Sequence, residues 1–110
     1  MKFIADASQE TPVQMSEGVQ RRVLAFGGSL MIGQFSFEAG AKAAWHSHLH
    51  EQVSYIVSGE IDYCTENAEP VRLKAGCSFY VPSNLKNRVV AIVPTVIVDA
   101  FTPQREEFLR

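Results

Sequence analysis

The fold is decided by residues 52–65, which read QVSYIVSGEIDYCT. β-Branched and aromatic residues recur through this stretch, as is typical of strands that pack on one face. Ser58-Gly59-Glu60 interrupts it with residues that tolerate turn geometry. We therefore expect a strand over Gln52–Ser58, a tight turn, and a second strand over Glu60–Thr65.

The same pattern extends outward in both directions, from Val19 to Phe101. Short apolar or alternating runs are separated by Gly, Pro and Asn at the regular spacing of a β-sandwich or barrel, and helical periodicity is absent. Beyond the two strands above, the expected strands are Val19–Phe26, Leu30–Glu38, Ala43–His48, Val71–Leu73, Ser78–Val81, Asn87–Ile92 and Thr95–Phe101. The sequence predicts an all-β fold.

The chain length and its two ends complete the expected architecture. With 110 residues the chain can form one core and is too short for two, so we expect a single domain over 1–110 with a barrel core at about 18–101. After Phe101, Thr102 and Pro103 suit the cap and first position of a short C-terminal helix. The first dozen residues are either an edge strand or an arm swapped with a partner.

Composition excludes several classes of partner. The chain is 46% hydrophobic and 20% charged, as in globular proteins, and its net charge is only −2. The ten Lys and Arg residues are scattered, so we expect no nucleic-acid partner. No apolar run could span a bilayer or act as a signal peptide, so we expect a cytoplasmic protein without a membrane partner. Cys64 and Cys77 are expected to be free thiols.

All three histidines of the chain lie within residues 46–50, the sharpest chemical signal in the sequence. On an extended strand His46 and His48 project to one face about 7 Å apart, so both imidazoles can reach one metal ion. If the chain bends after His48, Gln52 can add a carbonyl oxygen. His50 then has either a direct role or a supporting one at the rim. The alternative is a histidine pair that binds no metal.

The residues around these histidines resemble the first motif of the cupin family. In this chain the motif is Gly40, His46-x-His48, Gln52 and Gly59, with Gln52 in place of the usual glutamate. The second cupin motif is similar to Gly76 followed by Pro82, and Asn87 stands where cupins usually place a third metal-binding histidine. The resemblance implies a double-stranded β-helix, the jelly-roll barrel of the cupins.

Within the cupins, the chain is similar to the KdgF-type proteins of uronate metabolism over nearly its whole length. The similarity is carried by residues 46–59, by Pro82-Ser83-Asn84 and by the tail DAFTPQREEFL at residues 99–109. It implies metal-dependent conversion of cyclic 4,5-unsaturated monouronates from pectin and alginate to their linear keto form. It also implies a homodimer with N-terminal strands paired across the interface.

The same resemblance implies a role for each residue of the site. His46, His48 and Gln52 would bind a divalent ion (nickel, zinc, manganese or iron), with Asn87 as a weak additional ligand. Asp99, Phe101 and Arg105 would contact the uronate or another small sugar acid, with Arg105 as a forked donor to its carboxylate. Three alternatives stay open. Asp99 could be paired with the backbone or with Arg88, and Arg105 could lie on a helix surface. The protein could also be a non-catalytic sugar-acid-binding cupin with a degraded metal site.

Overall fold

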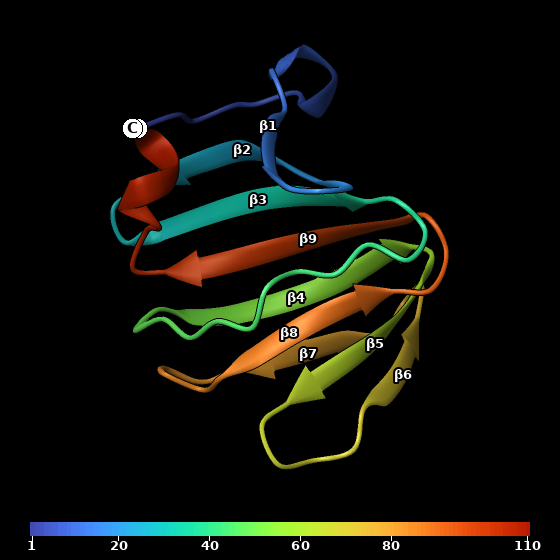
Figure 1. The fold of residues 1–110 in the computed structure, drawn as a ribbon. Helices are drawn as coiled ribbons and strands as arrows, with labels where there is room; N and C mark the ends of the chain where they lie inside the picture. Colours follow the sequence, from blue (N-terminus) through green and yellow to red (C-terminus); the bar gives the residue numbers. More distant parts are fainter.

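A computed structural model describes residues 1–110, and strands dominate it (Figure 1). The nine strands are β1 (Val13–Ser16), β2 (Val19–Gly27), β3 (Leu30–Phe37), β4 (Glu51–Ser58), β5 (Glu60–Thr65), β6 (Val71–Lys74), β7 (Ser78–Val81), β8 (Asn87–Ala91) and β9 (Thr95–Thr102). Two short 3-10 turns are present, η1 (Ala7–Gln9) and η2 (Glu106–Leu109). The all-β expectation is confirmed, and β4 and β5 match the two strands from which it started.

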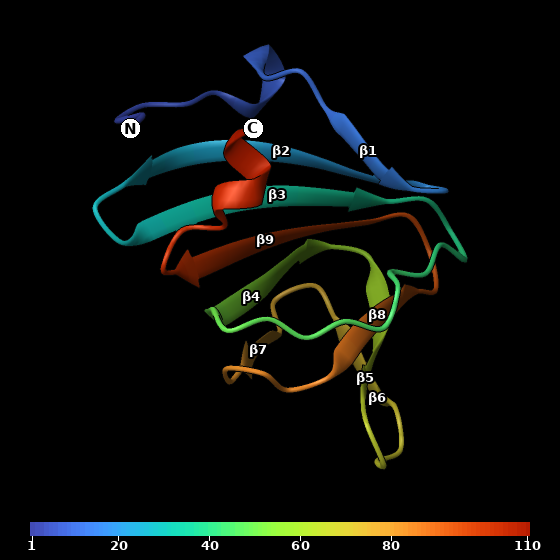
Figure 2. The same cartoon turned by 60° about the vertical axis from the view of Figure 1, so that its left-hand side comes forward.

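The strands form two sheets that enclose one core. The larger sheet has the order β1-β2-β3-β9-β4-β7 and the smaller one the order β6-β5-β8. Figure 2 shows the smaller sheet lying beyond β4, across from β2 and β3. Ten buried residues from both sheets form the core: Val19, Met31, Phe35, Phe37, Ile56, Ile61, Val89, Ala91, Ile97 and Phe101. Burial of each large side chain contributes roughly 1.5–3 kcal/mol to stability.

The turn that first suggested the fold depends on a glycine. Gly59 has a φ of +97°, in the left-handed region that glycine adopts without strain. A Cβ atom there would lie 2.3 Å from Oγ1 of Thr95 and 2.6 Å from the carbonyl oxygen of Pro94. The close approach of the β4–β5 turn to the start of β9 therefore requires glycine.

The expected strand Ala43–His48 is wrong, because the chain there follows β8 without forming a regular ladder. Its pairings are isolated bridges, from Lys42 to Val90 and from His46 to Asn87. The backbone N–H of Ala43 donates to the carbonyl of Val89, and that of His46 donates to the carbonyl of Asn87. Between these two hydrogen bonds the segment advances by three residues, whereas β8 advances by two. An extra residue of this kind interrupts the ladder as a bulge does.

The expected C-terminal helix is also wrong, because only the single 3-10 turn η2 forms. Thr102 ends β9 opposite Glu51 and does not cap a helix, and the bond between Thr102 and Pro103 is cis. Gln104 is held by tertiary contacts: its side chain donates to the carbonyl of Gly28 at 2.8 Å, and its own carbonyl accepts from His50 at 3.0 Å. These contacts override the local capping preference.

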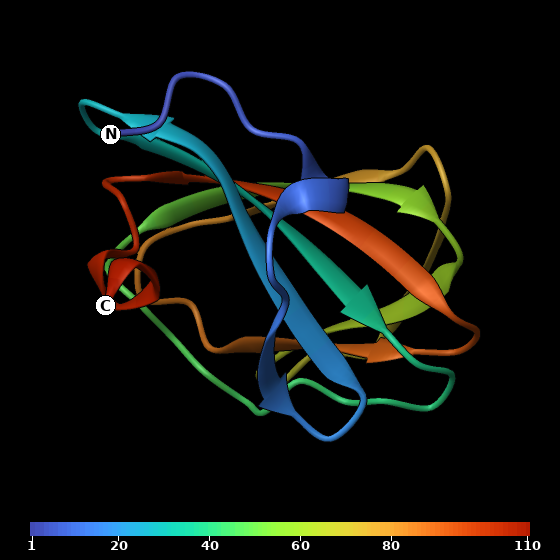
Figure 3. The same ribbon diagram turned by 90° about the horizontal axis from the view of Figure 1, so that it is seen from above.

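The N-terminal residues lie along β2 in this chain (Figure 3). Lys2 pairs with Phe26 through two backbone hydrogen bonds of 2.8 and 3.0 Å, and Arg22 donates to the carbonyl of Glu10. The edge strand of the larger sheet begins only at Val13. No helical segment in the chain has the length and hydropathy needed to cross a bilayer.

Candidate active site

A cavity of about 290 Å³ lies between the two sheets and gathers the residues that the sequence singled out. His46, Gln52, Asn87, Asp99, Phe101 and Arg105 all line it. His48 does not line the cavity directly but contacts Gln52 at its edge. The remaining lining is mostly apolar and includes Phe35, Phe37, Phe79, Val89, Ile97 and Phe108.

The pairing of β4 with β9 places the polar residues of the cavity. Gln52 lies opposite Phe101 and Ser54 lies opposite Asp99. Side chains alternate between the two faces of a strand, so all four project inward together, and all four are buried. Asp99 and Phe101 share one face of the sheet, as the sequence indicated.

The two histidines at the corner of the cavity have fixed tautomers. Nδ1 of His46 lies 2.9 Å from the carbonyl oxygen of Ala44, and Nδ1 of His48 lies 3.0 Å from that of His50. A carbonyl can only accept a hydrogen bond, so each Nδ1 carries the proton and donates it. In the neutral ring Nε2 then carries the lone pair, which is the form that binds a metal.

Nε2 of His48 faces Oε1 of Gln52 at 3.2 Å. The amide of Gln52 is oriented by its own donor, because Nε2 donates to Oγ of Ser54 at 2.8 Å. In the neutral ring with its proton on Nδ1, Nε2 of His48 and Oε1 of Gln52 are both acceptors, and a bound cation would satisfy them together. Burial lowers the pKa of His48, as do the charges of Arg105 and, more weakly, His46, so a second proton on the ring is disfavoured.

A divalent metal ion fits this corner. Asn87 donates through Nδ2 to the carbonyl of Leu85 at 3.0 Å, which leaves its Oδ1 without a hydrogen bond in the chain. No group of three or more His, Cys, Asp or Glu side chains is arranged to hold a metal. An ion at the corner would therefore have the imidazoles of His46 and His48 and the amide oxygens of Gln52 and Asn87 as its protein ligands.

Asp99 is a buried carboxyl group with a strongly shifted pKa. Burial raises its pKa from 3.8 to about 7, against the opposing effects of a hydrogen bond from Ser54 and the charge of Arg105. Its Oδ1 has no hydrogen-bond partner in the chain. Arg88 does not neutralise it, because the Arg88 guanidinium lies over the ring of Trp45, 4.9 Å from the centroid.

Arg105 reaches the cavity from the C-terminal tail and does not lie on a helix surface. Its side chain is only 15% exposed, and its guanidinium carbon lies 5.3 Å from the ring centroid of Phe101 and 4.5 Å from that of Phe108. Nε donates to the carboxylate of Glu107. The two terminal nitrogens have no partner in the chain, so they are available to an anionic ligand.

His50 and Phe108 show how the tail is held against the barrel. Nε2 of His50 donates to the carbonyl of Gln104, the residue before Arg105, which supports the expected position of His50 at the rim. Phe108 packs against Phe35 and Phe101, with centroid distances of 6.1 and 6.0 Å. The sequence reasoning missed Phe108, for which no local signal exists, and Ser54, which its spacing of two from Gln52 could have revealed.

A model of the cupin domain family matches residues 33–101. The chain belongs to the cupin family. This cupin is 30% identical over 110 residues to the pectin degradation protein KdgF of Dickeya dadantii (strain 3937). The aligned region covers 97% of this chain and 96% of that protein. The resemblance to the KdgF-type proteins is thereby confirmed.

Two solved structures show the same fold. An RmlC-like cupin from Shewanella frigidimarina NCIMB 400 matches with a TM-score of 0.91 at 31% identity, covering 98% of this cupin and 96% of that chain. KdgF from Halomonas sp. matches with a TM-score of 0.88 at 28% identity, covering 96% of both chains. The jelly-roll barrel expected from the sequence is confirmed.

The pKa of Asp99 has a consequence for stability. Its folded-state pKa of about 7 lies above the ordinary 3.8, so between these values the unfolded chain releases a proton that the folded chain retains. Stability is therefore lost as pH rises from about 4 to about 7, by on the order of 4 kcal/mol. Asp99→Asn removes this contribution.

Urea unfolding of wild type and Asp99→Asn at pH 4.5 and pH 7.5 measures the effect. We expect the unfolding free energy of wild type, relative to the variant, to fall by several kcal/mol from the lower pH to the higher. Other titrating groups cancel in this difference. A difference that is constant, or that rises with pH, would show that Asp99 ionises normally in the folded state.

Proposed function

We propose that this cupin converts 4,5-unsaturated monouronates to their linear keto form. The observation that carries the proposal is one small cavity that brings together a buried carboxyl group with a pKa near 7 and a guanidinium whose two terminal nitrogens have no partner. At its edge lie the imidazoles of His46 and His48 and the amides of Gln52 and Asn87, which we call the imidazole–amide corner. At about 290 Å³ the cavity lies at the small end of ligand pockets and suits a single sugar ring. The relationship to pectin degradation protein KdgF supports a sugar acid as the substrate.

Arg105 would bind the carboxylate of the substrate. Its terminal nitrogens can donate two parallel hydrogen bonds to one carboxylate, a geometry that lysine cannot reproduce. The rings of Phe101 and Phe108 hold the guanidinium from its flanks, and the bond from His50 to Gln104 fixes the preceding residue. The sugar ring would thus be oriented with its carboxylate end toward the C-terminal tail.

Asp99 would carry the proton. The sugar ring opens when the anomeric hydroxyl loses its proton to Asp99 and the bond between the anomeric carbon and the ring oxygen breaks, which leaves an aldehyde and an enolate. The enolate becomes a ketone when carbon 4 gains a proton, so the overall reaction is an isomerisation without a co-reactant. A carboxyl group with a pKa near 7 can both accept the first proton and supply the second.

His46, His48 and Gln52 would hold a divalent ion, with Asn87 as the weakest ligand. A nickel, zinc, manganese or iron ion bound there would polarise a sugar oxygen as a Lewis acid. Two imidazoles favour these transition metals, whereas the amide oxygens favour harder ions. Asn87 in place of a third imidazole would therefore weaken the ion's binding.

The test follows the ultraviolet absorbance of the unsaturated uronate, with proton NMR to identify the linear product. We expect wild type to accelerate the conversion and His48→Ala to abolish the acceleration. Asp99→Asn should lower kcat by about 10²–10⁴-fold because proton transfer is lost. Arg105→Lys should mainly raise KM, because the forked contact is lost while the charge stays.

Arg72→Lys is the matched control for Arg105→Lys, because Arg72 is an arginine on the outside of β5 and β6 whose donors are already occupied. It should leave both constants unchanged. Calorimetry with the same uronate distinguishes the alternative function. Binding without any acceleration by metal-loaded wild type would contradict the enzymatic proposal and identify a non-catalytic sugar-acid-binding cupin.

We also propose that the protein is a homodimer. The outer face of β4 exposes Val53, Tyr55 and Val57, and Tyr80 lies opposite Val53 on β7. Phe3 and Ile4 of the N-terminal segment are exposed as well. Each partner of a stable interface buries about 800 Å², and a second copy could cover the sheet face and the N-terminal segment together.

Sedimentation equilibrium tests the dimer. We expect wild type to be dimeric and Val53→Lys to be monomeric, because a charge would be buried in the interface. Val71→Lys is the matched control, since Val71 on β6 is exposed to the same degree as Val53, 54% against 52%, and lies on the other sheet. A monomeric wild type, or a dimer that survives Val53→Lys, would contradict the proposal.

A further inference from the structure

A second cavity lies on the outside of the smaller sheet and is separate from the candidate active site. Its volume is about 520 Å³, and it shares no lining residue with the inner cavity. It lies between the indole of Trp45, the β5–β6 loop at residues 66–70, and the start of β8 with Lys86 and Arg88. We call this surface the outer groove.

The outer groove lies directly behind the imidazole–amide corner. His46 and Asn87 line the inner cavity, while their chain neighbours Trp45 and Arg88 line the outer groove. The two segments are joined by backbone hydrogen bonds of 3.1 and 2.9 Å between His46 and Asn87. Neighbouring side chains of these two segments therefore face opposite ways, one toward the inner cavity and the next toward the outer groove.

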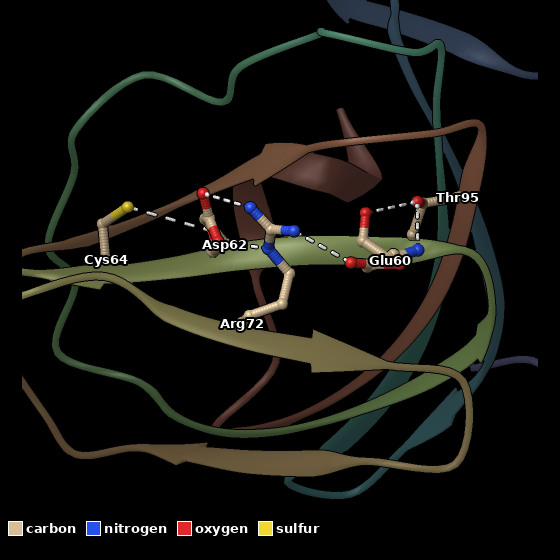
Figure 4. Close-up of polar contacts among 5 residues, drawn as sticks. All are labelled: Glu60, Asp62, Cys64, Arg72 and Thr95. Atoms are coloured by element: carbon tan, nitrogen blue, oxygen red, sulfur yellow. Dashed lines mark hydrogen bonds and ion pairs between the residues drawn. The ribbon is translucent and has the colours of Figure 1, made fainter.

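Arg88 is a cation without a carboxylate partner. Its guanidinium carbon lies 4.9 Å from the centroid of the Trp45 ring, its Nε is buried without a hydrogen-bond partner, and it forms no ion pair. Arg72 on the same outer face differs, as Figure 4 shows: it donates to Asp62 at 2.7 Å and to Glu60 at 2.9 Å. The donors of Arg72 are occupied, whereas those of Arg88 can serve a ligand.

Three kinds of group meet in the outer groove. Trp45 is exposed and has one ring face that the Arg88 guanidinium does not cover. Arg88 and the exposed Lys86 offer positive charge, and Glu66 and Glu69 on the loop offer acceptors. An aromatic ring packs against the apolar face of a sugar ring, cations bind its carboxylate, and glutamates accept from its hydroxyl groups.

We propose that the outer groove binds a uronic acid residue of an oligouronide, a chain of such sugars longer than the inner cavity admits. The ring stacks on Trp45 and its carboxylate lies between Arg88 and Lys86. The outer groove, at about 520 Å³, is larger than the inner cavity of about 290 Å³, which suits one ring. This binding requires no catalysis in the inner cavity.

Fluorescence measures the binding directly, because Trp45 is the single tryptophan of the chain. The probe is saturated trigalacturonate, and neutral maltotriose is the matched ligand without carboxylates. We expect a saturable change in emission with trigalacturonate and none with maltotriose. Arg88→Gln should weaken binding at least tenfold and Lys86→Gln, an exposed position that does not threaten folding, about threefold.

Two controls locate the site. Arg72→Gln changes an arginine of the same face whose donors are occupied, and it should alter the affinity by less than twofold. Arg105→Gln removes the carboxylate donor of the inner cavity and should also leave the affinity within twofold. Trp45→Ala, followed by calorimetry, should abolish binding.

Several results would overturn the proposal. They are a flat emission titration, an equal response to maltotriose, unchanged affinity in both Arg88→Gln and Lys86→Gln, or loss of binding in Arg105→Gln. The last result would place the ligand in the inner cavity. Because the trisaccharide is saturated, the outcome is independent of whether the protein opens unsaturated monouronates.

Discussion

The pairing register of β4 with β9 is the constraint on which the site depends. It sets Gln52 opposite Phe101 and Ser54 opposite Asp99, all facing the interior. A slip of one residue would turn every one of these side chains to the outer face and bring the exposed valines and Tyr55 inward. The apolar side chains that share their parity, Ile56 and Ile97, are fully buried, and their burial holds the register in place.

That register imposes a cost that the fold must offset. Asp99 is buried with one oxygen unpartnered. Unsatisfied buried polar atoms destabilise a protein by about 1–3 kcal/mol each. Such costs are typical of functional sites, where a ligand or ion later satisfies the groups.

Much of this arrangement could be predicted from local sequence. Strand periodicity indicated β4 and β5, and parity along β9 correctly placed Asp99 and Phe101 on one face. The failures have physical causes. A bulge interrupts the segment before His48, where alternation looks regular but one extra residue breaks the ladder. The tail is not helical because Gln104 forms hydrogen bonds with Gly28 and His50. These residues are far apart in the sequence, so local capping preferences cannot predict the contacts.

The inner cavity and the outer groove lie on either side of the hydrogen-bonded pair His46 and Asn87, which belongs to the imidazole–amide corner. We propose that His48 and Gln52 face each other because a divalent ion binds at this corner. The most direct measurement is calorimetric titration of nickel, zinc and manganese into protein purified without an affinity tag. We expect one ion per chain, at least tenfold weaker binding in His48→Ala, and tighter binding in Gln52→Glu, whose carboxylate replaces a neutral ligand. No saturable binding of any of these ions, or binding that His48→Ala leaves unchanged, would contradict it.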